Sequence, residues 1–168
     1  MEREKFEIAT AEGRFVFNAK PQIFEEMQIK NKMAELLGGI DKVSEFEVAI
    51  ANAYQKHEDF LKKKFGDELE RKREELQVLA NDKDKIDEYI KLGNELYSGN
   101  TYFVFANLQR EFNQLYDYGF AIVMCVEKPK DFDFEKQSES KMKEIVKLIR
   151  KSTESSKKKL QSSEGLQL

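Results

Sequence analysis

One stretch decides the fold, namely Phe120-Ala121-Ile122-Val123-Met124-Cys125-Val126, the only seven-residue run without a polar side chain. The chain around it is very polar, since 36% of the 168 residues are charged. Three β-branched residues and the flanking Gly119 and Pro129 are typical of a short buried strand or of the buried end of a helix. We expect the core to form where this run meets the other apolar segments.

An N-terminal hairpin is the predicted partner of this run. Phe6 and Ile8 flank a polar residue, a turn follows at residues 10–13, and Phe15 and Phe17 return on one face. The glycine of that turn can adopt the positive φ that a short hairpin connection needs. Because an isolated two-stranded hairpin is only marginally stable, we expect residues 121–126 to add a third strand.

Most other segments have helical spacing. Apolar residues recur at positions 29, 33, 36, 37 and 40, and Gly38-Gly39 predicts the end of that helix. A further stripe runs from Phe105 to Tyr116. The predicted fold class is α+β, predominantly α-helical, with about five to six helices packed on a small antiparallel sheet.

Several residues have the character of helix caps. Ser44 and Glu47 match a capping box at the start of a second helix. Asp84 and Asn100 are suitable N-caps for two later helices, and a last helix is expected from about Ser138.

The predicted domain organisation is a single α+β domain over residues 1–151 with a charged helical arm inserted at about 55–115. Residues 152–168 are expected to form a flexible basic C-terminal tail. Residues 136–168 contain nine basic and four acidic residues, whereas the whole chain has a net charge of -3. This asymmetry permits contact with nucleic acid or an acidic partner, although a solvated helix face explains it more simply.

The residue types that catalysis or metal binding needs are sparse. His57 is the only histidine and Cys125 the only cysteine, and each has apolar neighbours at helical or sequential spacing. Asp131 and Asp133 could share one side of an extended segment, but two carboxylates make a weak cation site. We expect no enzymatic activity, no metal and no cofactor, with Cys125 reduced and buried.

Membrane and nucleic-acid functions are not favoured by the sequence either. No apolar stretch approaches the roughly 18 residues that would span a bilayer, and the first residues lack a hydrophobic signal region. Seven aromatic residues between Tyr102 and Phe120 could stack on nucleic acid, but Arg110 is the only basic residue among them. We expect a cytosolic protein. We expect the seven aromatic residues to form part of a helix core.

The order of segments resembles that of the small tail assembly chaperones of long-tailed, siphophage-like bacteriophages. The resemblance rests on the hairpin and following helix, on Val48-Ala49-Ile50-Ala51-Asn52-Ala53, and on Val126-Glu127-Lys128-Pro129-Lys130-Asp131-Phe132-Asp133 before a short charged helix. It covers residues 5–54 and 116–150, whereas 55–115 resembles an added arm. Asp131 stands where that family often has glycine.

The resemblance implies a non-enzymatic protein of the host bacterial cytoplasm, absent from the mature virion. Such a protein binds and solubilises the tape measure protein during tail assembly, and commonly forms homo-oligomers. Weak apolar contacts repeated along a client would suit this role. The predicted partner-binding side chains lie in the last helix, the segment before it and the arm: Phe132, Phe134, Met142, Ile145, Val146, Ile149, Leu69, Leu76 and Leu79.

Two other functions remain open from the sequence. One is a structural tail or neck adaptor of the virion, built on the same small sheet. The other is a nucleic-acid-binding regulator that uses the basic C-terminal helix, which would bind with a steep dependence on salt.

Overall fold

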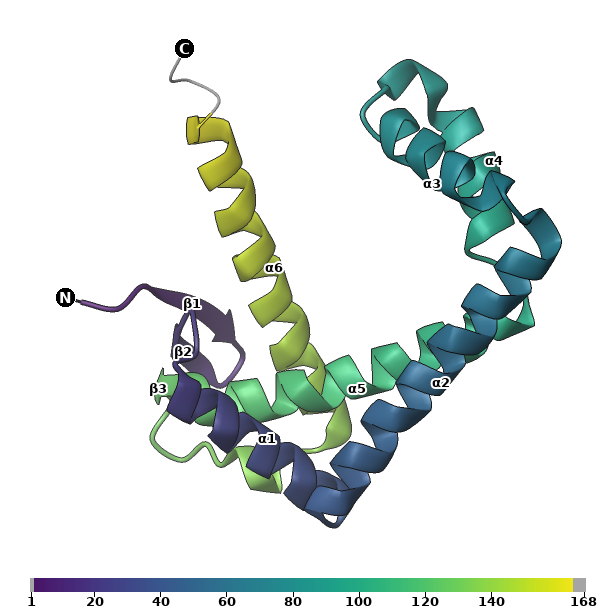
Figure 1. Cartoon of the computed structure of the whole chain (residues 1–168). Helices are drawn as coiled ribbons and strands as arrows, with labels where there is room; N and C mark the ends of the chain where they lie inside the picture. Colours follow the sequence, from purple (N-terminus) through teal and green to yellow (C-terminus); the bar gives the residue numbers. More distant parts are fainter. Residues whose placement is uncertain (1, 165–168) are drawn as a thin grey trace. The chain divides into compact units, whose positions relative to one another are not determined.

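The computed structural model describes the backbone of residues 2–164 and the side chains of residues 2–155. The chain forms two compact units. We call Met1–Val43 together with Asn113–Leu168 the sheet unit, and Ser44–Phe112 the helical unit. Within the described residues the α+β, predominantly helical fold class is confirmed, with six α-helices and one three-stranded sheet (Figure 1).

The hairpin has the predicted position. Strand β1 (Lys5–Thr10) pairs antiparallel with β2 (Gly13–Asn18), and Phe6 lies opposite Phe17. Gly13 has φ +137° at the turn, where L side chains are strained. A Cβ at this position would also lie 3.1 Å from Cγ of Pro129. The turn therefore needs glycine for both its conformation and its close contact.

The predicted strand over 121–126 is only partly correct. Helix α5 (Asn100–Met124) continues through most of the apolar run, and β3 comprises only Cys125–Glu127. Strand β3 does pair antiparallel with β2, giving the order β1-β2-β3. Phe120, Ala121 and Met124 are buried at helical spacing, so the helix can satisfy the backbone of this run while burying its side chains.

Aromatic rings fill the core of the sheet unit. Phe15 and Phe17 are fully buried, with ring centroids 6.4 Å apart. Phe132 meets Phe15 edge-on at 4.8 Å, and Phe134 lies 5.9 Å from the same ring. Helix α6 (Glu139–Glu164) packs against β1 and contributes the buried Ile145.

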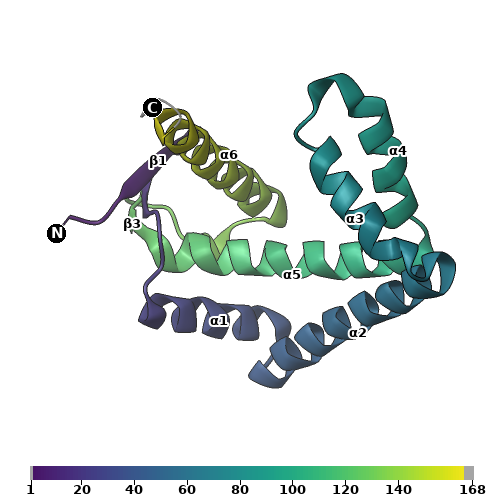
Figure 2. The same cartoon turned by 45° about the horizontal axis from the view of Figure 1, so that its top comes forward.

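Helix α1 (Ile23–Leu37) and the C-terminal half of α5 lie side by side in both Figure 1 and Figure 2. Gly119 permits this approach, because a Cβ there would lie 3.0 Å from the carbonyl oxygen of Ile29. The C-cap of α1 is Gly38 with φ +89°, as the sequence predicts.

Two of the predicted helix caps are wrong. Helix α2 (Ile40–Phe65) starts directly after the Gly38-Gly39 turn, so Ser44 lies inside it. The observed capping box joins Gln22 and Glu25 at the start of α1. Asp84 is not a cap either, because Asp82 accepts a hydrogen bond from the Asp84 backbone N–H in the short 3₁₀ turn Lys83–Lys85.

The helical unit has a core made of leucines. Helices α3 (Glu68–Leu79) and α4 (Ile86–Leu96) pack on each other. Their contact buries a cluster that also includes a residue of α2: Leu61, Leu69, Leu79, Leu92 and Leu96. The arm predicted at 55–115 thus lies largely within a compact unit of its own.

Helix α6 starts as expected and ends later than expected. Ser138 accepts a hydrogen bond from the Lys141 N–H through its side chain and from the Met142 N–H through its carbonyl. The helix continues to Glu164, past Ser152, where the sequence predicts a tail. Residues 165–168 of the predicted tail lie outside the described residues.

Candidate partner-binding surfaces

The side chains predicted to bind a partner lie in the two cores. Only Leu76 is more than 9% exposed; the buried ones are Phe132, Phe134, Met142, Ile145, Val146, Ile149, Leu69 and Leu79. Their role in partner binding stays a prediction, and on the folded chain all of them except Leu76 are buried. The apolar stripe of α6 packs on the sheet, and the leucines of α3 pack on α4. Spacing identified apolar faces but could not say which of them the fold covers.

A first exposed apolar surface lies at the start of α1. Ile23, Phe24 and Met27 are 84%, 68% and 59% exposed, and we call these three residues the α1 patch. Ile29 and Met33, on the other side of the helix, are buried. The sequence contains an indication of this exposed surface, since α1 has more apolar residues than one helix face can hold.

A second exposed apolar surface follows α4. Ile86, Tyr89, Ile90 and Tyr97 fall on one side of the helix and are between 39% and 57% exposed. We call these four residues the α4 stripe. Because the leucines of α4 are buried on α3, this short helix has two apolar faces, of which the helical unit covers one.

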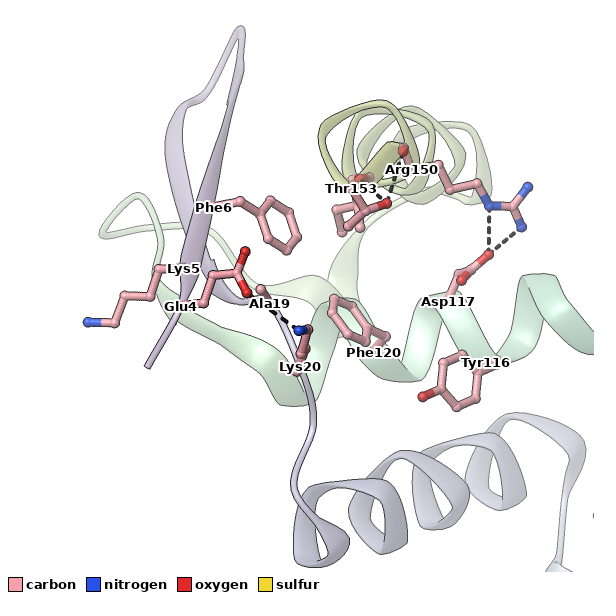
Figure 3. Close-up of a pocket in the computed structure, with 11 residues that line it drawn as sticks. Glu4, Lys5, Phe6, Ala19, Lys20, Tyr116, Asp117, Phe120, Arg150 and Thr153 are labelled. Atoms are coloured by element: carbon pink, nitrogen blue, oxygen red, sulfur yellow. Dashed lines mark hydrogen bonds and ion pairs between the residues drawn. The ribbon is translucent and has the colours of Figure 1, made fainter. Parts of the chain in front are cut away.

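The sheet unit contains an open pocket of about 320 Å³ between the hairpin, α5 and α6 (Figure 3). Phe6, Phe120 and Ile149 provide its apolar lining. Charged and hydroxyl groups complete the lining: Glu4, Lys5, Lys20, Tyr116, Asp117, Arg150 and Thr153. An apolar wall with charges of both signs suits one apolar side chain of a polar segment better than a small charged metabolite.

The ionisable groups of this pocket are engaged with one another. Arg150 donates through Nε to Asp117 at 2.8 Å, as Figure 3 shows. Burial raises the pKa of Asp117, and the arginine opposes that rise. Burial also raises the pKa of Tyr116, whose hydroxyl donates to Glu26 of α1 at 2.9 Å. These contacts join α5 to α1 and α6, and the raised pKa of Asp117 and of Tyr116 disfavours proton loss from either group.

The basic face of α6 is partly neutralised by local acids. Lys141 forms ion pairs with Glu12 and with Glu144, the latter at 2.9 Å. Lys143 pairs with Glu139 at 2.8 Å. Such pairing weakens the positive field that nucleic-acid binding requires.

The single histidine has a structural environment. His57 is 2% exposed, its Nε2 lies 2.7 Å from the carbonyl oxygen of Leu96 and its Nδ1 lies 2.9 Å from the hydroxyl of Thr101. A carbonyl only accepts, so we assign the proton to Nε2. Both ring nitrogens thereby join α2 to the last residue of α4 and to the first turn of α5.

The remaining candidates for chemistry also have structural roles. Cys125 is half-buried, and burial raises the pKa of its thiol to about 11, which disfavours the reactive thiolate. Asp133 accepts from the Glu135 N–H and so caps a 3₁₀ turn, whereas Asp131 is exposed. Among the residues that the structure describes, no group of three or more histidine, cysteine or acidic side chains could hold a metal ion.

None of the helices over the described range has the length and apolar character needed to cross a bilayer. Compared with protein-family models, with curated proteins and with solved structures, the chain matches none of them.

Proposed function

We propose that this protein is a non-enzymatic tail assembly chaperone, which binds the tape measure protein of a long-tailed bacteriophage and keeps it soluble in the host cytoplasm. The α1 patch is the observation that carries the proposal. It leaves three large apolar side chains more than half exposed on a chain that is otherwise rich in charge. Contiguous exposed apolar side chains commonly mark a binding surface.

The surroundings of the α1 patch suit a client that is partly apolar and partly charged. The pocket-lining residues Ala19 and Lys20 shortly precede the patch in the chain, and Tyr116 of the same pocket bonds to Glu26 within α1. A client helix could therefore place one apolar side chain in the pocket and others on the patch. Each contact would be weak, and many copies along a long client would supply avidity.

The resemblance to tail assembly chaperones is the reason for proposing the tape measure protein as the client. Most of the resembling segments, 5–54 and 116–150, fall in the sheet unit, and the added segment falls mainly in the helical unit. The α1 patch belongs to the sheet unit, so the proposed binding surface lies in the part of the chain that resembles the family.

Co-expression with the tape measure protein encoded in the same genome tests the proposal. We expect the client to be soluble with the wild-type chain and to precipitate with Phe24→Asp. Val48→Asp is the matched control, because Val48 is 58% exposed and lies in the helical unit. It should protect the client as the wild type does.

Two results would contradict this proposal. If the client is equally insoluble with and without the wild-type chain, the chaperone function is wrong. If Phe24→Asp protects the client fully, the α1 patch is not the binding surface. Mass spectrometry of purified virions is an independent check, since a chaperone should be absent from them.

A further inference from the structure

The pocket of the sheet unit has an aromatic lining that comes from two elements. Phe6 belongs to the hairpin and Phe120 to α5, and Figure 3 shows both rings at the same cavity. Ile149 of α6 completes the apolar part of the lining. Aromatic rings attract one another in offset or edge-on contact, beyond what the burial of area alone provides. The lining therefore favours an aromatic occupant over an aliphatic one of equal area.

The volume of the pocket exceeds what a single ring needs. Apolar cavities of about 150 Å³ hold one benzene molecule. The pocket measures about 320 Å³. A two-ring side chain uses the additional volume, whereas a leucine or valine side chain would leave part of it to water. Apolar walls that stay in contact with water gain nothing from binding.

The charged groups of the lining already compensate one another. Lys20 pairs with Glu4 at 3.8 Å, and Arg150 donates through Nε to Asp117 at 2.8 Å. The amine of Lys5 extends away from the cavity in Figure 3. A charged occupant would therefore find no unpaired opposite charge among these described side chains. Burial of a charge without a partner is costly, so the pocket favours a neutral occupant.

One acceptor of the lining is left for an occupant. Among the described residues, Oδ2 of Asp117 receives two hydrogen bonds from Arg150, and Oδ1 receives none. The side chain of Asp117 is 24% exposed, so this oxygen is partly shielded from water. An indole ring has one N–H donor and no acceptor. Tryptophan is therefore the neutral two-ring side chain that can also donate to Asp117, which phenylalanine cannot do.

We propose that the pocket binds a tryptophan side chain of the client, with the indole ring against the apolar lining and its N–H donating to Oδ1 of Asp117. The inference deepens the proposed function and rests on it for the source of the tryptophan, which is the tape measure protein. It adds the residue type that fills the pocket. Client helices with a tryptophan near other apolar residues would engage the pocket and the α1 patch together.

Fluorescence titration with N-acetyltryptophanamide tests the inference without a client. The chain contains no tryptophan, so the indole emission comes from the probe alone. We expect a saturable blue shift as the protein is added, because the indole enters apolar surroundings. The dissociation constant should be on the order of 0.1 to 1 mM, since one side chain makes few contacts. N-acetylleucinamide should compete about tenfold more weakly than unlabelled aromatic probe.

Two matched variants test whether binding occurs in the pocket. Thr153 lines the pocket, and among the described residues its hydroxyl bonds to carbonyls of its own helix, at Ile149 and Arg150. Thr153→Phe therefore fills the cavity without breaking a contact between elements, and should weaken probe binding by about tenfold or more. Glu154→Phe is the control, because Glu154 is exposed and does not line the pocket. It should bind the probe as the wild type does, and circular dichroism checks that both variants fold.

A probe with a methyl group on the indole nitrogen tests the hydrogen bond to Asp117. Without the N–H, it should bind about tenfold more weakly, because the acceptor is charged. Equal affinity of the two probes would overturn the assigned hydrogen bond and the choice of tryptophan.

Three further results would overturn the inference: no saturable shift with the wild type, unchanged binding by Thr153→Phe, or equally strong competition by N-acetylleucinamide. Each of them leaves the co-expression result as it is, because Phe24→Asp changes the α1 patch and not the lining of the pocket. If the probe binds as expected while the client stays insoluble, the proposed function is wrong and the pocket remains a tryptophan-binding site.

Discussion

The sheet unit and the helical unit bury their cores by different means. The sheet unit packs five phenylalanines ring against ring, and the rings of Phe15, Phe132 and Phe134 meet at edge-on or tilted angles. The helical unit has a leucine cluster and two buried polar side chains, His57 and Glu58, whereas Asn18 is the buried polar side chain among the described residues of the sheet unit. Glu58 accepts a hydrogen bond from Arg73 at 2.5 Å.

This difference indicates where each unit is vulnerable. Apolar burial is non-directional and scales with the area removed from water, so the sheet unit should lose stability mainly through cavities. A buried polar group needs a particular partner, so the helical unit should lose stability when one partner of a hydrogen bond is removed. Substitutions that create a cavity in the sheet unit, and substitutions that remove a hydrogen-bond partner in the helical unit, test this difference.

Phe15→Ala should have the largest effect. Phe15 is fully buried and its ring contacts three other rings, so the change leaves a large cavity in the sheet unit. We expect the free energy of unfolding to fall by about 3 to 5 kcal/mol, measured by urea denaturation. Phe24→Ala, at a 68% exposed position, should change it by less than about 0.5 kcal/mol. Equal effects of the two variants would contradict the placement of the core.

His57→Leu should be the most damaging polar change in the helical unit. It removes the donor to the Leu96 carbonyl and the partner of the Thr101 hydroxyl, at a site that is 2% exposed. We expect a loss of about 2 to 3 kcal/mol despite the gain in apolar character. Lys56→Ala, next to it on the exposed side of α2, should be nearly neutral. A neutral His57→Leu would mean that apolar packing alone stabilises this unit.

Gly119→Ala should destabilise the sheet unit by about 2 kcal/mol. The new Cβ would lie 3.0 Å from the carbonyl oxygen and 3.1 Å from Cγ2 of Ile29, so α1 and α5 must separate. Thermal unfolding followed by circular dichroism would measure the loss. An unchanged midpoint would show that the two helices do not approach as described.

Arg3→Ala should reduce the pH dependence of stability. Hydrogen bonds from Arg3 and from the Gln22 N–H lower the pKa of Glu25 to about 2, from 4.5. A lowered folded-state pKa stabilises above pH 4.5, and this stability is lost as the pH falls through 4.5 toward 2. We therefore expect Arg3→Ala to lose less stability than the wild type does when the pH falls from 7 to 3.

Urea denaturation at pH 7 and pH 3 measures the contribution of Arg3. The matched control is Arg14→Ala, which breaks the exposed pair with Glu7 and should leave the pH dependence unchanged. An identical pH dependence in wild type and Arg3→Ala would remove the assigned role of Glu25.

Gly93→Ala should have the smallest effect, and the opposite sign to Gly119→Ala. Its new Cβ would make only an ordinary contact, 3.9 Å from Leu76, and alanine favours the helix. We expect the free energy of unfolding to rise by about 0.5 kcal/mol, measured by urea denaturation. A loss of stability would mean that Gly93 is needed inside the helical unit.

Local residue types were sufficient to predict part of this structure. Alternation of apolar residues and a glycine at the turn predicted the hairpin, and Gly38 and Asn100 predicted the end of α1 and the start of α5. These features depend on neighbours in the chain, so the sequence alone contains their physical cause.

The apolar run at 120–126 was harder, because an unbroken apolar sequence has no periodicity that separates strand from helix. The structure buries only part of this run, namely Phe120, Ala121 and Met124. The binding surfaces were harder still. Apolar spacing showed that α1, α4 and α6 have faces to bury, but not which faces the fold would cover.

The sequence by itself determined the fold class, the hairpin with its glycine turn, and most of the helices, since these follow from local spacing and backbone preference. Only the tertiary structure decided that Phe132, Ile145 and their neighbours form a core while the α1 patch and the α4 stripe stay exposed. The physical reason is that burial depends on which distant segments meet, and hydrophobic attraction has no direction that a local pattern could record.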